Sequence, residues 1–358
     1  MSRRRDPIEE RADVDVDLYD IATWERRGLL DGLASGIYRV LVASTRIFVV
    51  GVALLILVGI GGLSALTDPQ IGALTALSAI PALALAIYVR RSDATKGEPL
   101  SVLVATFLLG VLTANFAAVL NSYTKGVFAG LGFLGTALFF FLVVGPVEET
   151  VKLLAVRLYA YGHDRFEAVV DGAVYGAVAG LGFATIENAL YITQRLDEPT
   201  ATAGLGFLGN VLYVLQGADP STATAGLGLI GAGGGITAIR ALAGPGHVIY
   251  SAFAGYYLGL AKFNPRNRGP IVVKGLLVAA LIHATYNATV GIGSGLIGLA
   301  TGLGQLPSFL LYVLVYDGFF GFILFRKIRR YSRTYRAIHE GETAEESAFE
   351  AERTEFES

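Results

Sequence analysis

Acidic and imidazole side chains occur in four apolar stretches of this sequence: PVEETVK, GFATIEN, RALAGPGH and HATYN. In chain order the candidate site residues are Glu148, Glu149, Lys152, Glu187, His247, His283 and Asn287. Where a stretch is membrane-embedded, a central charge costs about 3 kcal/mol on insertion scales, so such groups are expected to face a shared, hydrated cavity. A carboxylate beside an imidazole in that setting is suited to activating water, which predicts hydrolysis.

The composition predicts that these stretches lie in a membrane. With 53% hydrophobic and 16% charged residues, the chain falls outside the range of soluble domains. A helix needs about 20 mostly apolar residues to cross the hydrocarbon layer. Eight runs qualify, which predicts an all-α polytopic helix bundle: 46–66, 71–89, 101–120, 136–160, 170–194, 240–261, 271–292 and 306–325.

The distribution of basic residues predicts the orientation. If both termini are cytoplasmic, all of the 28 Lys and Arg lie on the inner side except Lys125, Arg195 and Arg240. Basic residues favour cytoplasmic loops. We therefore expect a multi-pass protein of the cell (plasma) membrane with cytoplasmic N- and C-termini.

The sequence divides into three regions. Residues 1–45 are a cytoplasmic tail in which 19–46 suit an interfacial amphipathic helix. Residues 46–325 form the membrane domain, with a motif core at 136–292 and an extracytoplasmic Gly-rich insertion at 201–239, read as a re-entrant loop or two short helices. Residues 326–358 are a basic, then acidic cytoplasmic tail, and the ends 1–18 and 338–358 are expected to be mobile.

Helix geometry predicts how the polar residues meet. Adjacent spans run in opposite directions, so Glu149, Glu187, His247 and His283 fall in one layer of the bilayer. Glu148 and Lys152 are four residues apart and share a helix face, and His283 and Asn287 do likewise. Pro146 is expected to kink its helix just before the glutamates. Glycines at helical spacing, such as Gly172, Gly176 and Gly180, predict close helix packing.

Two hydrolytic chemistries fit this set of residues. Glu149, His247 and His283 are candidate ligands of a divalent metal, with Zn²⁺ the commonest choice for His and Glu donors. A metal-free set fits equally, in which a buried glutamate takes a proton from water while the histidines and Asn287 bind the oxyanion. The sequence leaves both open.

The four stretches, in this order on successive spans, resemble the PrsW family of intramembrane proteases. The wider group, which includes type II CAAX prenyl proteases, has similar paired glutamates and histidines, but Lys152 three residues after Glu149 is closer to PrsW. The resemblance implies cleavage of a membrane-bound protein, typically an anti-sigma-factor-like regulator, and no nucleic-acid partner. It also implies a catalytic set of Glu148, Glu149, His247 and His283, assisted by Glu187 and Asn287.

Other interpretations stay open at this point. The absence of cysteine excludes a thiol nucleophile, and no Gly-x-Ser-Gly, Gly-x-Gly-Asp or His-Glu-x-x-His motif is present. Glu148, Glu149 and Lys152 would meet water if they lay at a helix end, and Glu187 and Asn188 would suit polar helix packing. A proton- or ion-coupled transporter and a non-catalytic scaffold are the rival functions.

Overall fold

The computed structural model describes residues 17, 26–59, 67–93, 95, 97–197 and 225–356. Within these residues the chain is helical with no strand, so the all-helical prediction is confirmed. The main helices are α2 (Leu29–Gly59), α4 (Pro69–Arg91), α5 (Leu100–Phe128), α6 (Gly132–Phe139), α7 (Gly145–Leu158), α8 (Val169–Asp197), α10 (Ala225–Lys262), α11 (Arg268–Thr301) and α12 (Gln305–Phe356).

Two compact units divide the chain, Met1–Val52 and Ala53–Ser358. In the first unit, α2 continues without a break through residue 46, where the interfacial segment was predicted to meet the first span, and that division stays a prediction. No proline interrupts its sequence, so nothing forces the helix to end there. The part of the interfacial prediction at 19–25 lies outside the described residues.

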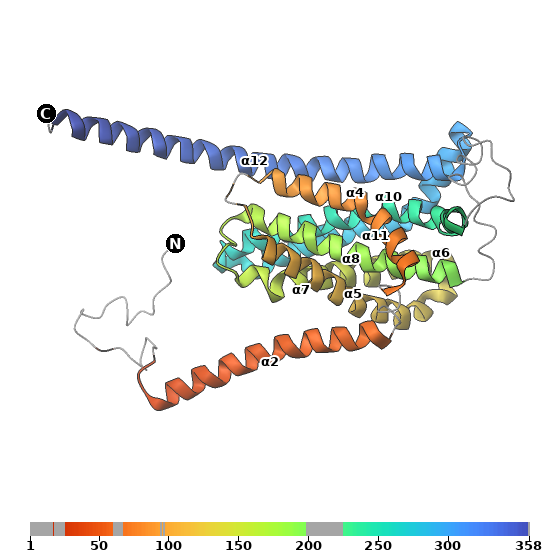
Figure 1. The fold of residues 1–358 in the computed structure, drawn as a ribbon, viewed down its shortest axis with the longest axis horizontal. Coiled ribbons are helices and arrows are strands. Elements are labelled where there is room, and N and C mark those ends of the chain that lie inside the picture. Colours follow the sequence, from red (N-terminus) through yellow and green to blue (C-terminus); the bar gives the residue numbers. More distant parts are fainter. Residues whose placement is uncertain are drawn as a thin grey trace. The chain divides into compact units, whose positions relative to one another are not determined.

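In the second unit, α8 is the most buried of the candidate membrane helices. It packs most extensively on α10 and also contacts α4, α5 and α7, and these helices lie side by side in Figure 1. Glycines let α8 and α10 approach closely, which confirms the packing prediction. The contacts pair Gly172 with Gly255, Gly176 with Ser251, and Gly180 with His247.

Five helical segments among the described residues are long and apolar enough to cross a membrane: Pro69–Arg91, Leu100–Gly162, Val169–Leu196, Pro265–Thr301 and Gln305–Ile338. The second of these holds α5, α6 and α7. Because α5 and α7 contact each other, the chain turns back between them. The turn includes Gly132, whose φ of 56° favours glycine. The prediction of eight spans therefore stays a prediction.

The helix that carries the paired glutamates is irregular just before them. A π-helical turn at Phe140–Val144 separates α6 from α7, and Pro146 lies in the first turn of α7. Short π-helical turns often occur at functional sites. The π-helical turn lies before Pro146. A helix accommodates proline in its first turn without breaking, so Pro146 does not interrupt α7.

Two boundaries differ from the sequence analysis. Residues 225–239, assigned to the Gly-rich insertion, are the first part of α10, while residues 198–224 lie outside the described residues. The acidic segment 338–356, expected to be mobile, continues α12 as helix. Its many Ala and Glu residues are good helix formers, which explains the difference.

Candidate active site

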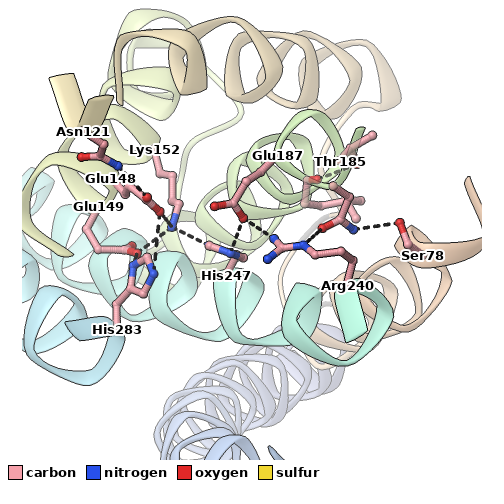
Figure 2. A network of polar contacts seen from close by, with 12 residues as sticks. Ser78, Asn121, Glu148, Glu149, Lys152, Thr185, Glu187, Arg240, His247 and His283 are labelled. Carbon is pink, nitrogen blue, oxygen red and sulfur yellow. Dashed lines mark hydrogen bonds and ion pairs between the residues drawn. The ribbon is translucent and has the colours of Figure 1, made fainter. Parts of the chain in front are cut away.

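Four helices bring the predicted polar residues together inside the bundle. Figure 2 shows Glu148, Glu149 and Lys152 of α7 facing Glu187 of α8, His247 of α10 and His283 of α11. The two imidazole rings lie with their centroids 5.1 Å apart and nearly perpendicular. All of these side chains are buried except Glu187, which is partly buried. The interfacial interpretation of the glutamate pair is therefore wrong, because Glu148 is only 4% and Glu149 0% exposed.

Lys152 joins the two halves of this cluster. Its Nζ lies 2.7 Å from Glu149 Oε1 and 2.9 Å from His247 Nδ1, but 3.9 Å from Glu148 Oε2. The lysine therefore pairs chiefly with Glu149, and not with Glu148 as the four-residue spacing suggested. An ammonium group only donates hydrogen bonds, so His247 Nδ1 is the acceptor and carries no proton.

His283 is oriented by Glu149. Its Nδ1 lies 2.9 Å from Glu149 Oε1. Because a carboxylate only accepts, Nδ1 donates and the lone pair of Nε2 is left toward the cluster. Nε2 lies 3.7 Å from Glu148 Oε2. Carboxylates that hold the far nitrogen of a histidine in this way are typical of metal sites and of catalytic histidines.

His247 is held from the opposite side by α8. Its Nε2 lies 2.9 Å from Glu187 Oε2, and the same oxygen also pairs with Arg240 Nη2. The guanidinium group bonds Asn188 as well, with Nε 2.8 Å from Oδ1. Figure 2 shows this chain of contacts running on to Ser78 of α4, whose Oγ accepts from Asn188 at 2.9 Å. Glu187 acts as a bridge between two α10 side chains, and Asn188 serves helix packing.

The sequence patterns predicted no role for three further residues of the cluster, Arg240, Asn121 and Ser78. Arg240 was placed at the outer end of the predicted span 240–261, although it lies seven residues before His247 and hence on the same face of one helix. Asn121 was lost because the predicted third span stopped at 120, whereas α5 continues to Phe128. Its Nδ2 donates to Glu148 Oε1 at 3.0 Å. No signal in the sequence identifies Ser78, a small polar residue in an apolar span.

A cavity of about 710 Å³ opens beside the cluster. The candidate residues that line it are Glu148, Glu187, His247, His283 and Asn287. Neither Glu149 nor Lys152 is among the described residues that line it. Of the adjacent glutamates, Glu148 therefore contacts the cavity, and Glu149 supports the cluster from behind. Asn121 and Arg240 also line the cavity.

The donor set fits a divalent metal. Glu148, His247 and His283 each offer one ligand atom, and these atoms lie within 4.8 Å of one another. Glu148 Oε2 is buried and lacks a hydrogen-bond partner, as expected of an oxygen that serves a ligand. The group of ligand atoms that lie together thus contains Glu148, whereas the prediction from sequence named Glu149 with the two histidines. Both nitrogens of His247 have partners, so its coordination requires one to be exchanged.

Buried carboxylates and imidazoles that open onto a cavity within a bundle of apolar helices are suited to hydrolysis inside a membrane protein. The profile of the PrsW family of intramembrane metalloproteases matches residues 98–317. The chain belongs to this family and is a multi-pass membrane protease. The match extends beyond the predicted motif core at both ends.

Individual relatives agree with this assignment. Protease PrsW of Geobacillus kaustophilus is 30% identical over 210 residues, covering 58% of this chain and 75% of the relative. Protease PrsW of Bacillus subtilis is 26% identical over 254 residues, or 70% and 92% of the two chains. No solved structure matches at a significant level. Family membership does not favour the transporter or the scaffold.

Proposed function

We propose that the chain is an endopeptidase that hydrolyses a peptide bond of a membrane-bound protein substrate within the 710 Å³ cavity. The observation that carries this proposal is the presence of Glu148, His247 and His283 on the wall of one cavity inside the bundle. Its volume of about 710 Å³ is far larger than a single ion needs, which favours a protease over an ion-coupled transporter.

In the mechanism without a metal, Glu148 is proposed as the general base. Its Oε2 accepts a proton from a water molecule as the water oxygen forms a bond to the carbonyl carbon of the substrate. When the C–N bond breaks, the same carboxyl group gives a proton to the leaving nitrogen. Asn121 fixes the carboxyl group through the other oxygen, 3.0 Å away. Asn287, on the cavity wall, is proposed to donate to the developing oxyanion.

The remaining residues keep the imidazoles in place. Glu149 holds His283 through Nδ1, and Lys152 holds Glu149 and His247 at the same time. Glu187 and Arg240 fix His247 from the cavity side. These contacts restrict the movement of the two imidazole rings. Because small displacements of catalytic groups lower the reaction rate strongly, we expect the contacts to favour catalysis.

Glu148, His247 and His283 are proposed to hold a divalent metal, for which Zn²⁺ is the commonest with such donors. When bound, the metal supplies Lewis acidity to the substrate carbonyl and to water. The ammonium group of Lys152, which contacts Glu149 and His247, favours the alternative in which glutamate and imidazole act alone. Metal content separates the two.

The proposed location is the plasma membrane, with both termini in the cytoplasm. The charge distribution supports this orientation, because the basic residues gather in segments assigned to the inner side. Cysteine accessibility from either side tests it, since the chain has no cysteine of its own. A single cysteine placed in the C-terminal segment should be labelled only by a reagent that reaches the cytoplasm.

Proteolysis is tested with purified protein in liposomes and a panel of single-span peptides. We expect cleavage by the native chain, and at least a hundredfold loss in Glu148→Gln and in His283→Ala. Asp164→Asn is the control, because this exposed carboxylate lies outside the cluster. Equal cleavage by Glu148→Gln and the native chain would contradict the proposal, as would pH-dependent ion uptake without cleavage.

Metal content is measured on the same preparations. About one equivalent of metal in the native chain, lost in Glu148→Gln and His283→Ala, supports the metal site. Full activity of a metal-free preparation assigns the reaction to glutamate and imidazole alone.

A further inference from the structure

A second cluster of carboxylates lies far from the active site. Asp93 follows α4, Glu98 precedes α5, and Asp171 lies in the first turn of α8. One oxygen from each lies within 4.8 Å of the others. Asp171 is sixteen residues before Glu187 on the same helix, which places the cluster about 24 Å from the catalytic residues along α8.

Glu98 has no hydrogen-bond donor at either carboxylate oxygen, although the residue is only 2% exposed. Arg90 is the cation nearest to it among the described ion pairs, with Nε 3.6 Å from Oε2, beyond hydrogen-bonding distance. Burial raises the pKa of Glu98 to about 8, and the charges of Asp93 and Asp171 act in the same direction. The single guanidinium group of Arg90 does not offset the charge of three clustered carboxylates, so the site favours a proton or a further cation.

The two aspartates share one hydroxyl donor, and Asp93 Oδ1 also accepts from the backbone N–H of Thr95 at 2.8 Å. Asp171 Oδ2 accepts from the backbone N–H groups of Glu167 and Ala168, at 2.7 and 3.0 Å. The other oxygen, Oδ1, lies 3.3 Å from the hydroxyl of Thr95, which is also 3.0 Å from Asp93 Oδ2. A hydroxyl has one proton, so it serves only one of these carboxylates at a time.

Tyr175 adds another unsatisfied oxygen. It lies one helical turn after Asp171, is fully buried, and its hydroxyl has no hydrogen-bond partner. Two further described cations lie near the cluster: Arg165 donates to the Gly97 carbonyl, and Lys262, whose charge acts on Asp171, donates to the Tyr161 carbonyl.

We propose that Asp93, Glu98 and Asp171 bind a hard divalent cation, Mg²⁺ or Ca²⁺. All the donors are oxygens, which these cations prefer, whereas the catalytic cluster also offers imidazole nitrogen. The cation neutralises the buried charge and occupies the unsatisfied oxygens of Glu98. It joins the connection between α4 and α5 to the start of α8, and so fixes the helices that carry Ser78, Asn121 and Glu187.

The test uses thermal unfolding of the full chain in nanodiscs of zwitterionic lipid, so that cations do not act through anionic headgroups. After treatment with a chelator, Mg²⁺ or Ca²⁺ is added, with NaCl of equal ionic strength as the reference. We expect a saturable rise in Tm of roughly 5–10 °C at a hundredfold excess over Kd. Glu148→Gln, which lacks a catalytic carboxylate, is expected to show the same rise.

Glu98→Gln and Asp93→Asn are expected to lose the rise, whereas the exposed Asp164→Asn, with the same change of charge, retains it. Equilibrium dialysis of the Glu148→Gln protein with Ca²⁺ or Mg²⁺ gives a second measurement that needs no further variant, with one ion expected per chain. Absence of both binding and a saturable rise overturns the proposal and leaves a proton on Glu98 as the compensating charge. An equal rise in a folded Glu98→Gln protein also overturns it. Neither measurement depends on proteolysis.

Discussion

The variants Glu149→Gln and Glu148→Gln test whether the two adjacent glutamates have different roles, since Glu148 lines the cavity and Glu149 does not. Glu149 Oε1 lies 2.7 Å from Lys152 Nζ and 2.9 Å from His283 Nδ1, and both Glu149 and Lys152 are at most 1% exposed. The neutral amide leaves a buried ammonium group whose next carboxylate, on Glu148, is 3.9 Å away. Glu148→Gln keeps the acceptor for Asn121 and removes a carboxylate whose Oε2 has no hydrogen-bond partner.

The two changes should therefore differ in their effect on stability. Breaking a buried ion pair by removing one partner costs about 3–5 kcal/mol. Neutralising Glu148, which shares its site with two other carboxylates, is expected to cost about 1 kcal/mol or less. Both variants should lose proteolysis, so activity alone does not distinguish them.

The assay is the free energy of unfolding, measured by titration with a denaturing detergent after metal has been removed from all samples. Removal is needed because a bound metal would stabilise the native protein and not Glu148→Gln. We expect Glu149→Gln to be less stable than Glu148→Gln by at least 2 kcal/mol. Equal stability of the two variants, or the reverse order, would refute the division of roles.

Two more changes test the positioning of His247. In Gly180→Ala, the added methyl group would overlap the His247 carbonyl, so α10 must shift; we expect a loss of about 1–3 kcal/mol and slower proteolysis. Gly318→Ala, where nothing lies within 4 Å, should be neutral or slightly stabilising, and similar Tm values for both alanine variants would contradict the contact. Arg240→Lys keeps the positive charge but removes the guanidinium group, which binds Glu187 and the side-chain amide of Asn188 at the same time. We therefore expect kcat to fall at least tenfold. An unchanged kcat would show that Glu187 holds His247 without help.

The apolar runs alone determined much of this protein. The predicted run 170–194 lies within α8, and the run 271–292 lies within α11. In lipid, the backbone N–H and C=O groups must form hydrogen bonds within the helix, so a long apolar run predicts a helix of similar length. The cost of burying charge in lipid explains why Glu149 and His283 were expected to meet. The polar composition of the acidic end of α12 did not indicate that this segment is helical.

Only the tertiary structure decided which side chain does what within the cluster. Spacing shows that Glu148 and Glu149 point about 100° apart, but the rotation of α7 against its neighbours determines which of them faces the cavity. Pairs such as Arg240 with Glu187, or Asp93 with Asp171, join residues distant in the chain, and no periodicity encodes them. They depend on how closely helices approach, which is set by contacts such as Gly180 with His247. Helix formation is a local property of the sequence, whereas the rotation and spacing of helices arise from packing of the whole bundle.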